Sequence, residues 1–325
     1  MLRSAGQPRA AVTTYATLLL STAQMRAAAI FGPGCSPKNL KLFQTDPGIE
    51  WRTDPPSSPD EADVVLVFGG DGTIHRHLHS LVTLGLPVLI VPVGSGNDFA
   101  RALGLRTVRD SLKAWQRFCS EKNNVRAIDL GTIRPLESLA QATTYFCSIA
   151  GIGLNTEVTR RANALPRWLR GRGGYALSLV PALFRFAPLP IKIFTQNSDP
   201  ANVLRSNGWM IRSDQPTMLA AFANTSSYGG GMKIAPDAKP DDGLLDACII
   251  ARVDPFKLAC MFPTVYFGRH LGIREVKYFQ AETMRVESEH PLDVYADGEF
   301  VCCTPLEISV QRKTLRVIID PMVQP

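Results

Sequence analysis

The first hundred residues alternate short apolar runs with amphipathic segments. Continuous apolar runs indicate buried strands, and apolar residues at helical spacing indicate helices. The pattern predicts strands over 27–32, 48–53, 63–68 and 87–94, and helices over 37–44, 73–85 and 97–105. Asn97 or Asp98 is the expected cap of the last helix. Buried strands that alternate with helices are typical of a parallel α/β sheet.

After Asp129 the pattern changes to short strands separated by turns. The predicted strands cover residues 145–154, 191–195, 208–213, 217–226, 244–253, 284–289, 292–298 and 306–319. Strands at such spacing favour a β-rich, sandwich-like domain. We therefore expect an α/β domain over 26–128 and a β-rich domain over 129–305.

Composition narrows the function classes. Of the 325 residues, 45% are hydrophobic and 20% are charged, which predicts a packed core rather than disorder. No stretch approaches the roughly 20 apolar residues of a membrane-spanning helix. The net charge of +6 favours an anionic partner: a nucleotide, a nucleic acid or an acidic membrane surface. Seven cysteines without a Cys-x-x-Cys pair indicate reduced thiols in a reducing compartment.

Residues 1–25 precede the first predicted strand. Two arginines followed by a mildly apolar run suggest a weak targeting peptide, although threonines interrupt the run. A disordered extension, or translation that starts at Met25, explains the segment better.

Two glycine turns carry the first candidate chemistry, at residues 69–73 (GGDGT) and 94–98 (GSGND). Each follows a predicted strand and precedes a helix, where backbone N–H groups and the helix dipole favour phosphate. Glycines permit close backbone approach, and open α/β sheets bind ligands at the carboxyl ends of their strands. Neither turn fits the P-loop or the dinucleotide fingerprint. The alternative is that both turns are only tight connections.

Asp71 adds a constraint to the first turn. A carboxylate beside phosphates repels them unless a divalent cation lies between, or unless the carboxylate orients a nearby donor. A magnesium nucleotide therefore explains Asp71 better than a bare phosphate does.

Three histidines in the following helix, His75, His77 and His79, raise the alternative of a metal site. Residues 75 and 79 share a helix face but 77 points away, and no further ligand lies at suitable spacing. A solvated or half-packed helix face is the simpler interpretation.

Together with "GIGLN", "KPDDGLLD" and "VYADGEF", the motifs "FGGDGT" and "PVGSGNDFAR" resemble the diacylglycerol kinase catalytic-domain family. That family includes soluble bacterial lipid kinases and sphingosine kinases. The resemblance extends from residue 26 to residue 320, whereas GGDGT alone is shared with NAD kinases. It implies an NAD-kinase-like nucleotide domain, to which the strand 306–320 returns, and a lipid-substrate domain over 129–305.

The resemblance also implies roles for single residues. ATP binding is assigned to Thr53, Gly69, Gly70, Asp71, Gly72, Thr73, Ile74, His75, Ser95 and Asn97. Asp98 and Asp129 match acidic positions that support the catalytic Mg²⁺ through water. Asp297 matches the general base, with Glu299 beside it. The resemblance also implies a structural Mg²⁺. Its ligands would be the main-chain carbonyls of Lys239 and Leu244 and the side chain of Asp242.

The residues themselves leave alternatives to the last two roles. A carboxylate can accept the proton of a lipid hydroxyl during phosphoryl transfer, which suits Asp297. Asp-Gly is also the strongest short hairpin signal, and both interpretations can hold. "PDDGLL" is by default a turn, although carbonyls with one aspartate suit a hard cation.

The chain departs from the family pattern at several places. The first turn reads "FGPGCS", and "DPPSSPDE" replaces most of a helix before the GGDGT strand. His75 stands where the family frequently has asparagine, and Asn155 where it frequently has aspartate.

The segment Arg160–Phe186 carries six arginines with interleaved aromatic residues. This mixture suits docking on an anionic membrane, and equally suits an amphipathic helix that packs on the core. No nucleic-acid-binding motif is present.

We therefore interpret the chain as an ATP- and Mg²⁺-dependent lipid kinase, cytoplasmic and peripheral on the inner membrane face. One alternative is a catalytically idle lipid- or nucleotide-binding regulatory protein, motivated by the shortened first domain. The other is NAD kinase, which does not explain "GSGNDFAR" together with "PDDGLLD".

Overall fold

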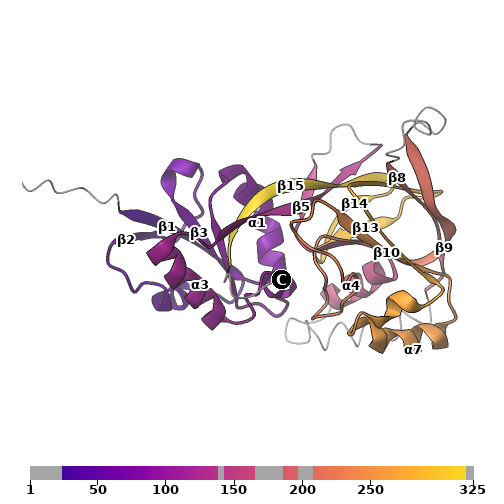
Figure 1. Cartoon of the computed structure of the whole chain (residues 1–325), viewed down its shortest axis with the longest axis horizontal. Coiled ribbons are helices and arrows are strands. Elements are labelled where there is room, and N and C mark those ends of the chain that lie inside the picture. The colour runs from indigo at the N-terminus through magenta and orange to yellow at the C-terminus, as the bar shows by residue number, and fades with distance from the viewer. Residues whose placement is uncertain (1–23, 138–142, 165–185, 197–207, 320–325) are drawn as a thin grey trace, which may run out of the picture.

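A computed structural model describes residues 24–137, 143–164, 186–196 and 208–319 (Figure 1). They form two lobes side by side along the long axis of the molecule. Residues 1–23 and most of Arg160–Phe186 lie outside the described residues, so the expectations for both segments stay predictions.

The first lobe is the predicted parallel sheet. Its strand order is β4 (Val88–Pro92), β3 (Val64–Gly69), β1 (Met25–Phe31) and β2 (Ile49–Arg52). Every neighbouring pair is parallel. All residues of β3 and β4 are buried because the sheet is covered on both faces, which explains their continuous apolar sequence.

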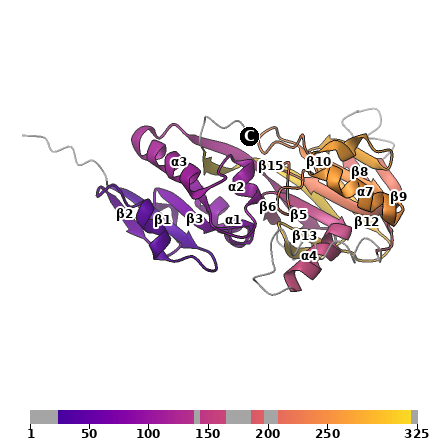
Figure 2. The same ribbon diagram turned by 90° about the horizontal axis from the view of Figure 1, so that it is seen from below.

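Helices and 3₁₀ turns surround this sheet. They are η1 (Pro37–Leu42), η2 (Pro59–Glu61), α1 (Asp71–Leu84), α2 (Asp98–Ala102) and α3 (Val108–Glu121). Helix α1 ends at Gly85, as predicted, with the left-handed φ of 62° that glycine tolerates. Figure 2 shows α1 on the side of the first lobe that faces the second lobe, next to β6.

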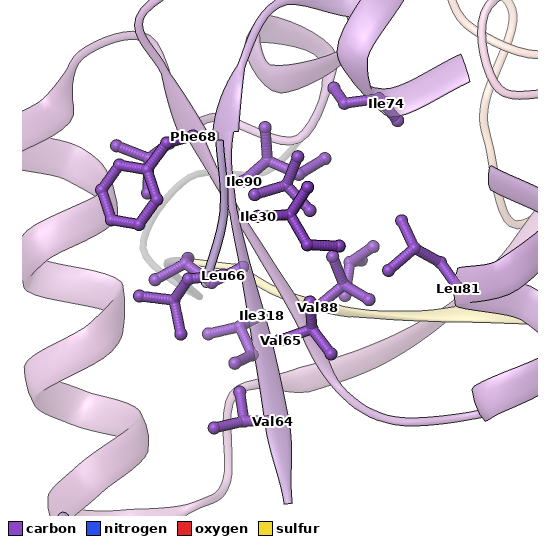
Figure 3. Close-up of a cluster of buried hydrophobic side chains, with 14 of the residues drawn as sticks. Ile30, Val64, Val65, Leu66, Phe68, Ile74, Leu81, Val88, Ile90 and Ile318 are labelled. Atoms are coloured by element: carbon purple, nitrogen blue, oxygen red, sulfur yellow. The ribbon is translucent and has the colours of Figure 1, made fainter. Parts of the chain in front are cut away.

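The core of the first lobe is built from both ends of the chain. In Figure 3, Ile74 and Leu81 of α1 lie on one side of the strands, and Leu66 and Phe68 point to the other side. Ile318, near the end of the described chain, lies within the same cluster.

Two long strands join the lobes, β5 (Val125–Pro135) and β15 (Leu306–Ile318). They pair antiparallel over most of their length, and the end of β15 runs parallel to β4 at Val317 and Val88. The sheet is therefore continuous between the lobes. A domain boundary at residue 129 falls inside β5, because this strand belongs to both lobes.

The second lobe is antiparallel and β-rich. Its path is β14-β13-β7-β9-β8-β12-β15, with β10 on β9, β11 on β10, and β6 on β5. The bounds are β6 Thr144–Phe146, β7 Ile149–Gly153, β8 Leu189–Gln196, β9 Trp209–Ala223, β10 Leu245–Ala251, β11 Val276–Ala281, β12 Thr283–Ser288, β13 Asp293–Ala296 and β14 Glu299–Cys303. Two apolar clusters fill this lobe, so the predicted two-part architecture is confirmed.

The second lobe also contains α4 (Leu154–Ala164), α7 (Pro255–Val265) and the 3₁₀ turn η4 (Arg269–Gly272). Helices α3 and α7 were not predicted from the sequence, although both carry start signals. Thr107 and Asp110 form a capping box at α3, and Asp254 accepts a bond from Phe256 N–H before Pro255 opens α7. No helix in the described part of the chain is long and apolar enough to cross a membrane.

Candidate active site

The two glycine turns pack directly on each other. A Cβ at Gly70 would lie 2.4 Å from the carbonyl oxygen of Gly96, and a Cβ at Gly94 would lie 2.5 Å from Gly70 Cα. Gly69 is also closely packed, because its Cβ would lie 2.5 Å from Thr73 Oγ1. Gly70 and Gly94 are therefore required by the contact between the turns, and Gly69 by the packing of Thr73, whatever ligand binds there.

Asp71 joins the two turns. Its Oδ2 accepts a hydrogen bond from Asp98 N–H and its Oδ1 from Phe99 N–H, both at 3.0 Å. Asn97 is the N-cap residue of α2, as predicted, but its side chain makes no capping bond. Asp71 accepts from the first N–H groups of that helix instead. Of the two explanations of this carboxylate, the geometry favours the orienting of nearby donors over a cation between it and phosphates. Burial and the neighbouring Asp98 raise the pKa of Asp71 to about 6.

Backbone donors remain available around these turns. The described residues give no hydrogen-bond partner to the N–H groups of Gly70, Gly72, Ser95 or Gly96. Ser95 is exposed, and Asn97 is held by bonds to Gly94. Free N–H groups at the start of the 14-residue helix α1 are suited to bind an anion.

Asp98 and Asp129 have protein partners. Asp98 is paired with Arg101 and accepts a bond from Gly230 N–H at 2.8 Å. Asp129 accepts bonds from Gly243 N–H at 2.8 Å and Lys313 N–H at 2.7 Å. Both carboxylates therefore fix loops around the lobe junction, and their support of a metal through water stays a prediction.

The Asp297 carboxylate is anchored in the second lobe. Asp297 lies in the turn between β13 and β14 with φ 51°, so the hairpin interpretation is confirmed. Its side chain is fully buried and accepts bonds from the N–H groups of Cys147 (2.8 Å), Ser148 (2.8 Å) and Ile149 (3.2 Å). Backbone donors carry no residue-type signal, so these three N–H contacts to Asp297 could not be predicted from the sequence.

His75 connects the two lobes. Its Nδ1 lies 3.3 Å from Asp297 Oδ2, and its side chain is 12% exposed. Burial raises the pKa of Asp297, but the bonds from His75 and the backbone N–H groups outweigh burial and hold it below its usual value. For His75, burial lowers the pKa, while Asp297 and Glu299 raise it and prevail.

The other predicted site residues are spread over both lobes. Glu299 is exposed, and its Oε1 would lie 3.5 Å from a Cβ at Gly72, which places the carboxylate beside the first glycine turn. Thr53 is exposed just after β2, at the edge of the first sheet. Thr73 and Ile74 are buried and serve the packing of α1.

The predicted ligands of the structural Mg²⁺ are all oxygen atoms. Asp242 is exposed and its Oδ1 accepts a bond from Leu244 N–H at 3.0 Å, while Oδ2 has no hydrogen-bond partner among the described residues. Lys239 and Leu244 lie on either side with their main-chain carbonyls. A free carboxylate oxygen and carbonyls suit a hard cation, so the residues fit the expected ion.

An apolar pocket opens in the second lobe between α4, α7 and β9. Only Asn155 and Tyr228 bring polar groups to its wall. The lining residues are Leu154, Asn155, Val158, Met218, Leu219, Tyr228, Met232, Ile234, Ile250, Leu258, Met261, Phe262 and Val265. Such a wall suits hydrocarbon rather than a polar ligand.

Known proteins agree with this arrangement. Residues 54–133 match the diacylglycerol kinase catalytic domain, and residues 148–319 match the YegS C-terminal NAD kinase beta sandwich-like domain. The chain is 35% identical over 262 residues to a diacylglycerol kinase of Mycobacterium tuberculosis, covering 79% of this chain and 76% of that protein. It is 28% identical over 261 residues to a diacylglycerol kinase of Bacillus subtilis, covering 80% and 78%.

A solved structure shows the same fold. A diacylglycerol kinase from Bacillus anthracis superimposes with a TM-score of 0.62 at 18% identity, covering 93% of this chain and 98% of that one. The motifs, the two-lobe fold and the matched family models lead to one conclusion. The chain belongs to the diacylglycerol kinase catalytic-domain family, and it is an enzyme of the lipid kinase class.

Proposed function

We propose that this enzyme transfers the γ-phosphate of ATP, in the presence of Mg²⁺, to a hydroxyl of a membrane lipid such as diacylglycerol. The apolar pocket in the second lobe is the observation that carries this choice of acceptor. NAD has no hydrocarbon chain to fill such a pocket, which disfavours NAD kinase.

The pocket lies at a suitable distance from the lobe junction. Strand β7 runs from Ile149, whose N–H contacts Asp297, to Gly153, and Leu154 then lines the pocket. Five residues of strand span about 16 Å at roughly 3.3 Å per residue. A lipid with its hydroxyl at the Asp297 hairpin can therefore extend its chains toward the pocket.

The donor site is proposed at the paired glycine turns. The free N–H groups of Gly70, Gly72, Ser95 and Gly96 would bind phosphate oxygens, aided by the dipole of α1. Magnesium, when bound, would neutralise charge on the phosphates. Asp71 would hold the two turns in one geometry, so that the γ-phosphate meets the hairpin of the second lobe.

Access to a bilayer lipid is proposed through the outer face of α7. Phe256, Cys260, Pro263 and Phe267 follow at helical spacing and are all exposed, the two phenylalanines by 73% each. The opposite face of α7 lines the pocket. Exposed Lys233 and Arg269 lie at the end of the helix, so the surface combines apolar insertion with attraction to anionic lipid.

The kinase proposal is tested by following radiolabelled γ-phosphate from ATP, with Mg²⁺, into mixed lipid and into NAD. Label in a lipid, absent with Asp71→Ala, supports the proposal, and chromatography identifies the acceptor. Label in NAD alone would indicate NAD kinase. ATP binding without any transfer would indicate an idle regulatory scaffold.

The docking face is tested by sedimentation with vesicles that contain anionic phosphatidylglycerol. Phe256→Ser with Phe267→Ser should reduce the bound fraction severalfold. Leu42→Ser is the matched control, because Leu42 is 57% exposed on the first lobe. Equal binding by the double variant and the control would exclude α7 as the membrane surface.

A further inference from the structure

Residues 224–232 form a loop that reaches from the second lobe to the first, and we call it the tri-glycine loop. It follows β9 and carries three consecutive glycines with a left-handed φ: Gly229 (59°), Gly230 (87°) and Gly231 (102°). The N–H of Gly230 donates to Asp98 Oδ2 at 2.8 Å. Asp98 belongs to α2 in the first lobe and its side chain is only 6% exposed, so little solvent reaches this inter-lobe bond.

The first-lobe side of this contact belongs to the proposed ATP site. The N–H of Asp98 donates to Asp71 Oδ2 at 3.0 Å, and Asp71 joins the two glycine turns. Arg101 pairs with Asp98 Oδ1, and its Nη1 would lie 3.7 Å from a Cβ at Gly231. The tri-glycine loop therefore lies against the residues of α2 that contact Asp71.

The ends of the tri-glycine loop meet the other functional parts. Tyr228 and Met232 flank the three glycines and pair through backbone bonds of 3.0 and 2.9 Å, and both line the apolar pocket. At the start of the loop, Asn224 N–H donates to the carbonyl oxygen of Ser148 at 2.8 Å. Ser148 N–H in turn donates to Asp297, which matches the family's general base. One loop thus connects the ATP site, the Asp297 hairpin and the pocket.

We propose that the tri-glycine loop couples the binding of the two substrates. Lipid in the pocket raises the affinity for ATP, and ATP raises the affinity for lipid by the same factor, because coupling between two sites is reciprocal. The inference rests on the function proposed above, specifically on its ATP and lipid sites, and adds a regulation of both.

The physical basis is conformational entropy. Glycine loses more freedom on ordering than any other residue, so three glycines in succession make the loop costly to hold in one conformation. Hydrocarbon that packs on Tyr228 and Met232 orders the loop from its pocket end. ATP then binds to turns that are already held through Gly230, Asp98 and Asp71, and the complex loses less entropy.

The coupling is measured by calorimetry with the unreactive analogue AMP-PNP and Mg²⁺, with and without dioctanoylglycerol in a neutral detergent. In the wild type the Kd for AMP-PNP should fall about tenfold when the lipid saturates, within the usual range for coupled sites. The Kd for the lipid should fall by the same factor when AMP-PNP saturates.

Two methionines of the pocket provide a matched pair of variants. Met232 and Met218 both line the pocket and are both 2% exposed, but only Met232 belongs to the tri-glycine loop. Met232→Ala and Met218→Ala remove the same atoms, and both should weaken lipid binding. The effect of bound lipid on the Kd for AMP-PNP should be largely lost in Met232→Ala and kept in Met218→Ala.

A second pair of variants tests the glycines themselves. Gly231→Ala places a Cβ at φ 102°, which strains the loop, and should also abolish most of the coupling. Gly208→Ala is the control, because φ is 80° there and no described atom lies within 4 Å of the new Cβ. In the wild type, hydrogen exchange of the Gly230 amide should slow when dioctanoylglycerol binds.

The outcomes separate this inference from the proposed function. Dioctanoylglycerol that binds without changing the Kd for AMP-PNP, or equal coupling in Met232→Ala and Met218→Ala, would overturn the inference alone. Coupled binding without phosphoryl transfer to any lipid would overturn the kinase reaction alone. No binding of dioctanoylglycerol would overturn the lipid acceptor and the inference together.

Discussion

Two buried carboxylates, one in each lobe, have opposite electrostatic settings. Asp71 accepts hydrogen bonds from two backbone N–H groups and lies near other acids. Burial, and to a smaller extent the charge of Asp98, raises its pKa to about 6. Asp297 accepts hydrogen bonds from three backbone N–H groups and from His75. These bonds lower its pKa although burial raises it. The number of donors and the sign of the neighbouring charge decide the outcome.

The difference predicts separate tasks for the two carboxylates. Asp71 bonds only within the first lobe and organises the glycine turns at the proposed ATP site. Asp297 is held in the second lobe and reaches the first only through His75. Binding of the phosphate donor and transfer of the proton should therefore be separable by mutation.

The largest expected effect comes from Asp71→Ala. Without the carboxylate the two glycine turns lose their shared anchor, and a misplacement of about 1 Å can cost about 10²-fold in rate. We expect kcat/KM for ATP to fall by about this factor in steady-state kinetics, while the NMR titration of His75 is retained. Glu50→Ala, an exposed acid on β2, is the control. An unchanged kcat/KM would show that the turns do not depend on Asp71.

A smaller effect is expected from Gly70→Ala. The added Cβ would overlap the Gly96 carbonyl, although φ at Gly70 is an ordinary −111°. ATP should bind about tenfold more weakly, because the turns must separate to accommodate a methyl group. The comparison is Gly85→Ala, where φ is 62° and no atom lies within 4 Å of the new Cβ. That variant should lose about 1 kcal/mol of stability without affecting ATP binding.

The smallest expected effect is the pH dependence of the free energy of unfolding that Asp71 causes in the absence of nucleotide. Because the folded pKa of Asp71 is about 6 against an ordinary 3.8, its contribution to stability falls as the pH rises through 6. The loss between pH 5 and pH 7 should be about 1 kcal/mol. The destabilisation by Asp71→Ala in urea unfolding should accordingly be larger at pH 5 than at pH 7.

The contribution of Asp297 to stability should change with pH in the opposite direction to that of Asp71. Its lowered folded pKa gives stability that is present above the ordinary value of 3.8 and is lost as the pH falls through the folded value. A penalty for Asp71→Ala that grows from pH 5 to pH 7 would contradict the contrast between the two carboxylates.

Much of the fold followed from the sequence because its signals are local. The apolar runs of β1, β3 and β4 and the stop at Gly85 were predicted from periodicity and turn chemistry. The capping signals of α3 and α7 were equally local and were overlooked. The sequence of β5 alone could not show that this strand runs through both lobes, because its partner β15 lies far away in the sequence.

For the site, the sequence alone predicted which residues carry chemistry: the two glycine turns, the Asp297 hairpin and a helix with His75. Only the tertiary structure decided which groups they contact. It turned Asp71 toward the backbone of α2 rather than toward solvent, and it surrounded Asp297 with N–H groups from 147–149. It also joined His75 to Asp297 across 222 residues. The physical reason is that every residue type except proline carries the same backbone donor, so only folding reveals which N–H groups each carboxylate accepts from.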